Sequence, residues 1–312
     1  MDRQIIIMKN IEKLGKVHFD TYLKKWNQEK LQKDWWHALK FLFNHSFARG
    51  RRDELSDEYQ AFTVEALKSH FSIDENESDS AYEKLKKNKR EFDKACILRF
   101  KRENGLKKNE NSLKKYDDFF KDVAEKNKVV KSLITKRRID KGWQGKSFAE
   151  PKEIFMGNDK DLMMVLDVLN FITKDESHKN SFNYVRNAIR SKGAEAVYSE
   201  LKGIEFIGDK IAALIIRDAL LSKPRLQITE DECTYAFPVD TWVKQLAKKL
   251  DFKDDGKNEN IVIKEYLINK CQNLGIDPLY FAQGLWCVGS NSLDILLRII
   301  EKKKIDNSIL AR

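Results

Sequence analysis

The chain has 312 residues and a formal net charge of +10, a surplus that favours a polyanionic partner, although a basic protein without such a partner has the same composition. Its four cysteines lie far apart and form no Cys-x-x-Cys pair, so neither a disulfide framework nor a zinc knuckle is implied, and a reducing cytoplasm is the expected location. The apolar run near the N-terminus is too short for a signal peptide or a membrane span.

Residues that favour sharp turns are scarce, because the chain contains only 4 prolines and 13 glycines. Sheets need frequent turns, so this composition predicts an almost all-helical protein. Residues 34–71 read as a helix, a polar turn and a second helix, and residues 72–80 as a loop. Between 81 and 141, lysine and glutamate are dense and apolar residues recur at helical intervals. This stretch is interpreted as solvated helices, with a disordered lysine-rich insertion as the alternative.

The second half of the chain is also helical in pattern. Helices are predicted over 159–173 and 181–204, and again from Lys210 onward. Residues 222–240 are the least helical stretch, and Pro238 precedes a new helix.

The C-terminal part of the chain contains clear signals for the start and end of a helix. Asp277 is placed to cap a helix that has Pro278 at its first position and ends at Gly289. A further helix is predicted over 291–304.

The stretch GIEFIGDKIAALIIRDAL, residues 203–220, has the pattern of a helix–hairpin–helix. Gly203 and Gly208 allow a tight backbone, and the following helix presents unpaired N–H groups at its dipole-positive end. A DNA phosphate is a suitable anion for that end. An ordinary connection between two helices would have the same glycines, so this alternative stays open.

Thirty residues further on, FPVDTWVKQLA places Asp240 at a helix start, where an N-cap is the simplest explanation. Taken together, the two segments resemble the helix–hairpin–helix DNA glycosylases, whose motif runs G-h-G-x-K-x-A and then h-V-D-x-x-h. Residues 207–212, IGDKIA, match the first part and residues 239–243, VDTWV, the second. The hairpin departs from the pattern by two extra residues, Glu205 and Phe206.

Two further segments are similar to the archaeal 8-oxoguanine DNA glycosylases: LGIDPLYFAQGLWCVG at 274–289 and FLFNHSFARGRRDE at 41–54. The resemblance covers nearly the whole chain outside 75–150. It implies an all-α fold of two helical subdomains with a DNA-binding cleft between them. The expected division is 31–239, which ends in the helix–hairpin–helix and carries a lysine-rich helical insertion at about 75–150, and 240–312, packed with 1–30.

The resemblance implies chemistry that suits the residue types. Cleavage of an N-glycosidic bond builds positive charge on the sugar, which the Asp240 carboxylate would stabilise. Lys210 would attack C1′, and the resulting Schiff base permits strand cleavage at the abasic site. Burial beside Ile207, Ile211 and Leu214 and the helix N-terminus are expected to favour the neutral, nucleophilic amine. The alternatives are a lysine that only contacts a phosphate, and an enzyme that uses Asp240 and water alone.

The target base must leave the duplex and enter a pocket. Phe47, Trp242 and Trp286 are candidate stacking or wall residues, with ordinary core packing as the alternative for each. The resemblance places Arg49, Arg51 and Arg52 on a loop that approaches the DNA; otherwise they are unremarkable surface charges.

Ser46 and Ala282 stand where the archaeal enzymes have a glutamine and an acidic residue, and a one-residue shift of the alignment would instead put Gln283 in the pocket. The smaller side chains weaken the case for 8-oxoguanine and favour a larger base, such as a hypermodified phage base removed in anti-phage defence.

Many members of this family hold an iron–sulfur cluster on four closely spaced cysteines after the aspartate. Only Cys271 and Cys287 follow Asp240, so no cluster and no other cofactor is expected.

Taken together, these features of the sequence predict a cytoplasmic, monomeric base-excision glycosylase with abasic-site lyase activity, which binds double-stranded DNA and needs neither a membrane nor an obligate protein partner. The rival from another class is a non-catalytic helix–hairpin–helix DNA-binding protein.

Overall fold

The computed structural model describes residues 3–48, 53–73, 78–92, 125, 127–141, 147–252 and 259–290. These residues are mostly helical, in agreement with the predicted class, and the sheet they contain has two strands. The chain folds as two compact units. Unit 1 comprises Met1–Gln28, Val185–Leu201 and Gly208–Arg312, and unit 2 comprises Glu29–Tyr184 and Lys202–Ile207.

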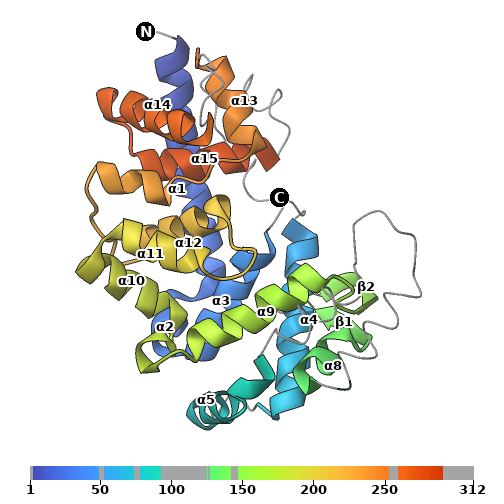
Figure 1. The fold of residues 1–312 in the computed structure, drawn as a ribbon. Helices are drawn as coiled ribbons and strands as arrows, with labels where there is room; N and C mark the ends of the chain where they lie inside the picture. The colour runs from blue at the N-terminus through green and yellow to red at the C-terminus, as the bar shows by residue number, and fades with distance from the viewer. Residues whose placement is uncertain are drawn as a thin grey trace. The chain divides into compact units, whose positions relative to one another are not determined.

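Unit 1 is built from helices that come from both ends of the sequence (Figure 1). They are α1 (Arg3–Trp26), the second part of α10 (Ser181–Lys192), most of α11 (Ala194–Lys202), α12 (Asp209–Leu221), the 3₁₀ helix η3 (Asp231–Ala236), α13 (Thr241–Lys249), α14 (Glu259–Asn273) and α15 (Pro278–Ser290).

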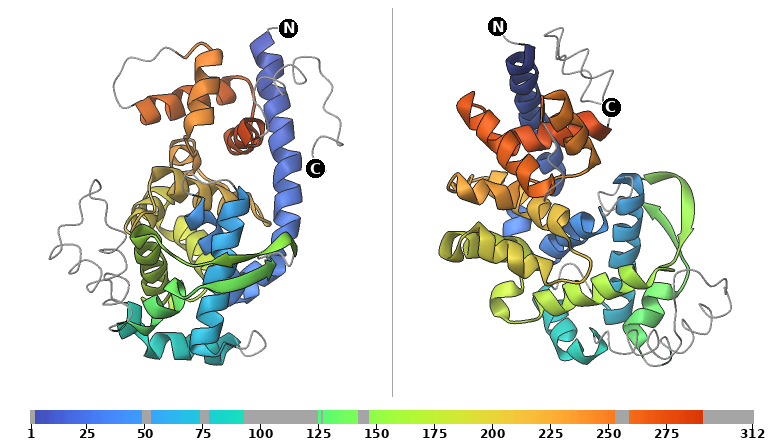
Figure 2. Two further views of the ribbon diagram at one scale, coloured as in Figure 1. Left: turned by 90° about the vertical axis from the view of Figure 1, so that its right-hand side faces the viewer. Right: turned by 45° about the horizontal axis from the view of Figure 1, so that its top comes forward.

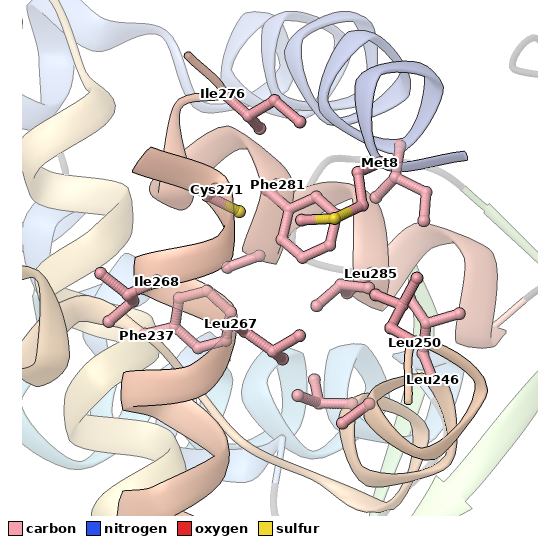
Figure 3. Packing of buried hydrophobic residues seen from close by; sticks show 14 of the residues in the cluster. Met8, Phe237, Leu246, Leu250, Leu267, Ile268, Cys271, Ile276, Phe281 and Leu285 are labelled. Carbon is pink, nitrogen blue, oxygen red and sulfur yellow. The ribbon is translucent and has the colours of Figure 1, made fainter. Parts of the chain in front are cut away.

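The core of unit 1 lies between α1, η3, α13, α14 and α15. Figure 3 shows Met8 from α1, Phe237 after η3, Leu246 from α13, Leu267 from α14 and Phe281 from α15 gathered in one apolar cluster. Each of these side chains is almost completely removed from water. Burial of this apolar surface is the main force that holds the helices together.

The helices α1 and α15 approach each other closely, side by side in the left view of Figure 2. Two glycines make this possible. A Cβ at Gly15 would lie 1.9 Å from the carbonyl oxygen of Tyr280, and a Cβ at Gly284 would lie 2.0 Å from that of Ile11. Because no larger residue fits at either position, the two backbones set the position of α15 in unit 1.

The C-terminal end of α12 is held by Arg186, a buried residue of α10. Its guanidinium donates to the carbonyl oxygens of Ala219, Ser222 and Pro224. The carbonyls of Ala219 and Ser222 lie at the helix end, where the last carbonyls have no partner within the helix, and Pro224 lies in the segment that follows. Burial lowers the pKa of Arg186 to about 10, so the side chain is still cationic at neutral pH.

Unit 2 contains the remaining described elements. They are α2 (Gln28–Lys33), α3 (Trp35–Phe47), α4 (Asp53–Phe71), α5 (Ser78–Lys87), the 3₁₀ helix η1 (Lys89–Phe92), α8 (Lys128–Ile134), β1 (Arg137–Lys141), β2 (Ser147–Ile154), α9 (Asp159–Ile172), the 3₁₀ helix η2 (Glu176–His178) and the start of α10. The helices predicted within 34–71, 159–173 and 181–204 are therefore confirmed.

The predicted helical insertion at about 75–150 needs a correction. It contains α5 and α8, but β1 and β2 form an antiparallel ribbon in which Arg137 pairs with Ile154 and Ile139 with Lys152. Two features of the sequence explain the strands. Side chains of β1 alternate so that Ile139 is buried between exposed neighbours, and Pro151 cannot stand in a helix interior.

The two units do not follow the predicted ranges 31–239 and 240–312, because Val185–Leu201 and the segment from Gly208 to residue 239 belong to unit 1. The predicted helix over 291–304 lies outside the described residues. Within the described residues, no helix combines the length and apolar character that a membrane crossing requires.

Candidate active site

Lys210 and Asp240 stand at the N-terminal ends of two helices of unit 1. Gly208 is the N-cap of α12, and its carbonyl oxygen accepts from the backbone N–H of Ile211 and Ala212. Lys210 is thus in the first turn of α12. Asp240 is the N-cap of α13, as its position after Pro238 predicts.

The two carboxylate oxygens of Asp240 have different partners. Oδ1 accepts from the backbone N–H of Trp242 and of Val243, both at 3.0 Å. Oδ2 lies 3.7 Å from Nζ of Lys210. The capping interaction therefore fixes the carboxylate, while its second oxygen faces the lysine. The structure brings these two predicted residues together although 30 positions separate them in the chain.

The expectation that Lys210 is buried among apolar side chains is not borne out. Its side chain is 31% exposed and that of Asp240 is 16% exposed. Ile211 is buried, but Leu214 is only half-buried. The Lys210 side chain is therefore partly exposed to solvent.

A residue that the sequence did not indicate, Tyr198 of α11, supports the first turn of α12. Its hydroxyl donates to Oδ1 of Asp209 at 2.7 Å, next to Lys210. Burial, followed by this hydrogen bond, raises the pKa of Tyr198 above its usual value. The ring also packs edge-on against Tyr235, with centroids 5.4 Å apart. Nothing in the spacing of Tyr198 from Asp209 points to this interaction.

The glycines of the hairpin do not act as predicted. The positive φ in this turn, 63°, belongs to Phe206, one of the two extra residues. Gly208 has φ −92° and ψ −175°, an extended conformation that any residue adopts. No atom lies within 4 Å of the position that a Cβ would occupy at Gly208. A side chain at position 208 would therefore meet no neighbouring atoms.

Trp242 follows Asp240 by two positions and lies at the surface of α13, 39% exposed. Its ring packs on the backbone of Gly289 in α15, since a Cβ there would come within 2.4 Å of Cγ of Trp242. The sequence predicts Gly289 only as the end of a helix, but this glycine also leaves the space that the ring fills.

The predicted pocket residues of α15 face α1. The amide nitrogen of Gln283 lies 2.7 Å from Nδ1 of His18, and the ring of Trp286 packs edge-on against His18 with centroids 5.3 Å apart. Gln283 is buried, and its Oε1 has no hydrogen-bond partner in the described part of the chain. Ala282 is buried as well, whereas Trp286 is half-buried. His18 was not foreseen, because nothing in the sequence links it to α15.

The predicted pocket residues of unit 2 lie in the packed interior of that unit. Ser46 and Phe47 are completely buried. The hydroxyl of Ser46 donates to the carbonyl oxygen of Leu42 at 2.7 Å, and the ring of Phe47 packs against Tyr59 with centroids 5.9 Å apart. These interactions are those of ordinary core residues. Arg49, Arg51 and Arg52 lie outside the described residues, and Gly203 lies in the turn after α11.

A cavity of about 660 Å³ opens elsewhere in unit 1 and contains none of the predicted site residues. Its lining is strongly acidic and includes Glu195, Glu230, Asp231, Glu232 and Glu265. Glu232 has a structural role there, since it accepts from the backbone N–H of Ala194 at 2.8 Å and of Thr229 at 3.0 Å. An acidic lining repels a polyanion, so this cavity is not a DNA site.

The cysteines described by the structure are buried thiols of unit 1: Cys233, Cys271 and Cys287. Burial raises the pKa of Cys233 and of Cys287 to about 11 and also raises that of Cys271, so they are protonated at neutral pH. No group of three or more histidine, cysteine or acidic side chains with metal-binding geometry occurs among the described residues.

No family model, curated protein or solved structure matches this chain. The assignment of a function therefore depends on the residues and the geometry described above.

Proposed function

We propose that this protein is a base-excision DNA glycosylase with abasic-site lyase activity, which acts on a modified base in duplex DNA. The observation that carries the proposal is the pairing of Lys210 and Asp240, with Nζ and Oδ2 3.7 Å apart at the N-terminal ends of α12 and α13. Both residues are accessible to a substrate, and they match the lysine and the aspartate of the glycosylase motif.

The pair can perform the required steps. Once it has lost a proton to solvent, the amine of Lys210 attacks C1′ with its lone pair. Asp240, whose Oδ2 lies 3.7 Å from Nζ, takes the second proton that the nitrogen loses after the new bond has formed. The bond between C1′ and the base breaks, and the base leaves with the bonding electrons and takes up a proton. Until it takes that proton from Lys210, Asp240 is ionised, and its negative charge stabilises the positive charge that develops on the sugar.

The C1′–O4′ bond of the sugar then breaks, O4′ takes up a proton, and the lone pair of Nζ completes a Schiff base with C1′. Loss of a proton from C2′ expels the 3′ phosphate, which cleaves the strand at the abasic site. Hydrolysis of the Schiff base with one water molecule frees Lys210 for another cycle.

The site is also suited electrostatically to DNA. Two helix N-termini present partial positive charge beside the pair, and the backbone N–H groups at the start of α12 are suitable donors to a phosphate. Ala282 leaves α15 without the acidic side chain of the archaeal enzymes, which supports a base other than 8-oxoguanine. A bulky hypermodified base, as in defence against phage, is the substrate that we favour.

Borohydride trapping tests the proposal on a panel of duplexes, each with one modified base, that includes 8-oxoguanine and glucosylated hydroxymethylcytosine. Wild type is expected to form a covalent adduct with at least one duplex. Lys210→Gln should abolish the adduct and leave duplex affinity within about twofold, because an exposed ion pair contributes little to binding or folding. Lys223→Gln is the control, since Lys223 is an exposed lysine beyond the other end of α12.

The rival function is a non-catalytic DNA-binding protein, and the capping role of Asp240 favours it, because a helix cap needs no chemistry. Duplex binding without base release from any member of the panel would support this rival. If the base is released but borohydride traps no covalent adduct, Lys210 is not the nucleophile, and Asp240 acts with a water molecule instead.

A further inference from the structure

The helix α13 is basic and amphipathic. Its sequence, TWVKQLAKK, has three lysines and no acidic residue. Val243, Leu246 and Ala247 are buried in the core, whereas Trp242, Gln245, Lys248 and Lys249 are exposed. Lysines on an outer helix face are ordinary, but an exposed indole among them is not, because tryptophan is mostly buried in folded proteins.

The indole of Trp242 is held in place on its inner side. Only glycine at position 289 leaves room for it, since a Cβ on Gly289 would lie 2.4–2.8 Å from Cγ, Cβ and Cδ1 of Trp242. The backbone N–H of Trp242 is also fixed by Oδ1 of Asp240. The ring is thus supported by α15 and its backbone is tied to the candidate active site, while its outer side is open to solvent.

This exposed position fits a base in a strand better than an extruded base. An extruded base needs an enclosed pocket, whereas the side chain of Trp242 is exposed at the surface and is not part of the acidic cavity of unit 1. A base within a strand needs only one aromatic face on which to stack, and every base offers such a face. The exposed neighbours of Trp242 on α13, Thr241 and Gln245, are polar, so the described face of this helix presents no apolar patch to a protein partner.

The spacing of the lysines suits a nucleic-acid backbone. Lys249 follows Trp242 by seven residues, which is two helical turns and about 10 Å along α13. A strand of B-form DNA advances roughly 3.4 Å per nucleotide, so this distance covers about three nucleotides. Lys248 is exposed at the same end.

We infer that the exposed face of α13 binds the DNA strand that contains the reacting nucleotide. The Trp242 indole stacks on a nucleobase adjacent to that nucleotide, and Lys248 and Lys249 bind phosphates further along the strand. This inference rests on the proposed function and adds a strand-binding surface that defines one side of the site.

The first test measures binding by fluorescence anisotropy to duplexes with a stable tetrahydrofuran abasic analogue. Two such duplexes carry 2-aminopurine, one on each side of the analogue. Trp242→Ala should weaken binding about tenfold and remove the stacking-dependent quenching of one probe, whereas Trp242→Phe should retain most of both effects. Ile261→Ala is the matched control, because Ile261 is 56% exposed on α14 of the same unit and should leave both signals unchanged.

The second test concerns the lysines. The double variant Lys248→Gln, Lys249→Gln should reduce the slope of log affinity against log salt concentration by about 1 to 2. Each lysine–phosphate contact displaces about one counterion from the DNA, so each lost contact removes about one counterion from the total released on binding. Lys9→Gln with Lys13→Gln removes the same charge from the exposed side of α1 and should change the slope by less than half as much.

The inference and the proposed function fail in distinguishable ways. Trp242→Ala with wild-type affinity and wild-type quenching overturns the inference, even if Lys210 still traps DNA. If Trp242→Ala weakens the binding of an acidic protein and leaves DNA binding unchanged, the exposed face of α13 is a surface for a protein partner instead. A wild-type protein that binds none of the duplexes overturns both. Thermal melting of Trp242→Phe shows whether a loss of folding explains any effect of Trp242→Ala.

Discussion

At the scale of single residues, Asp240 shows how a structural role and a chemical role can be separated. Oδ1 caps α13, and Oδ2 faces Lys210. Asparagine caps a helix nearly as well as aspartate, but it carries no negative charge. One substitution can therefore remove the charge and keep the cap.

We expect Asp240→Asn to lower the rate of base release by about a hundredfold or more, because the charge that stabilises the sugar cation is lost. The melting temperature should change little. Asp240→Ala loses the cap as well and should cost about 1 kcal/mol of stability. Single-turnover kinetics and thermal melting measure the two effects. Turnover near that of wild type for Asp240→Asn would show that Asp240 is only a cap.

At the scale of elements, the crossing of α1 and α15 decides where several site residues lie. Gln283, Trp286 and Gly289 all follow from the position of α15, which Gly15 and Gly284 allow to lie against α1. The packing of Trp242 on Gly289 then relates the start of α13 to α15. The position of α15 therefore links the core of unit 1 to the candidate site.

Gly284→Ala tests this crossing. Alanine favours a helix over glycine by about 1 kcal/mol, but its Cβ would lie 2.0 Å from the Ile11 carbonyl oxygen. Overpacking of this kind costs about 1–3 kcal/mol or more, which exceeds the gain from the helix preference of alanine. The free energy of unfolding, measured in urea, should therefore be lower than that of wild type.

Gly208→Ala is the matched control, since it meets no atom within 4 Å and should change stability by at most about 1 kcal/mol, the difference between glycine and alanine at an N-cap. If Gly284→Ala is as stable as wild type, the close approach of α1 and α15 is not needed for folding.

At the scale of the whole molecule, the two units contribute differently to the proposed function. Unit 1 contains Lys210, Asp240 and Trp242, and unit 2 contains the insertion with its ribbon. Parts of that insertion belong to the core of unit 2, because Tyr82, Leu85, Val129 and Leu133 are completely buried. Any deletion meant to test DNA binding must therefore spare α5 and α8.

Residues 96–122 can be replaced by a short glycine–serine linker, which removes eight basic and five acidic residues. If this segment binds DNA, the slope of log affinity against log salt concentration should fall by about one unit for each phosphate that the variant no longer binds. A control linker that retains the eight basic residues in scrambled order should recover most of the slope. An unchanged slope in the first variant would exclude the segment from the DNA interface, and melting curves show whether unit 2 is still folded.

The sequence alone determined the helical character of the chain, the bounds of α9 and α15, the starts of α12 and α13 and the capping role of Asp240, since these depend on local periodicity and on nearby residues. It also indicated Lys210 and Asp240 as partners, through a motif in which 30 positions separate them.

Only the tertiary structure decided the features that depend on interactions between distant segments. These include the hydrogen bond of Tyr198 to Asp209, the pairing of His18 with Gln283, and the packing of Trp242 on Gly289. It also decided that Phe206, not a glycine, has the positive φ of the hairpin, and that 137–154 pairs as strands. Side-chain exposure is likewise a property of the packed molecule, which is why the partly exposed Lys210 could not be foreseen from its apolar neighbours in sequence.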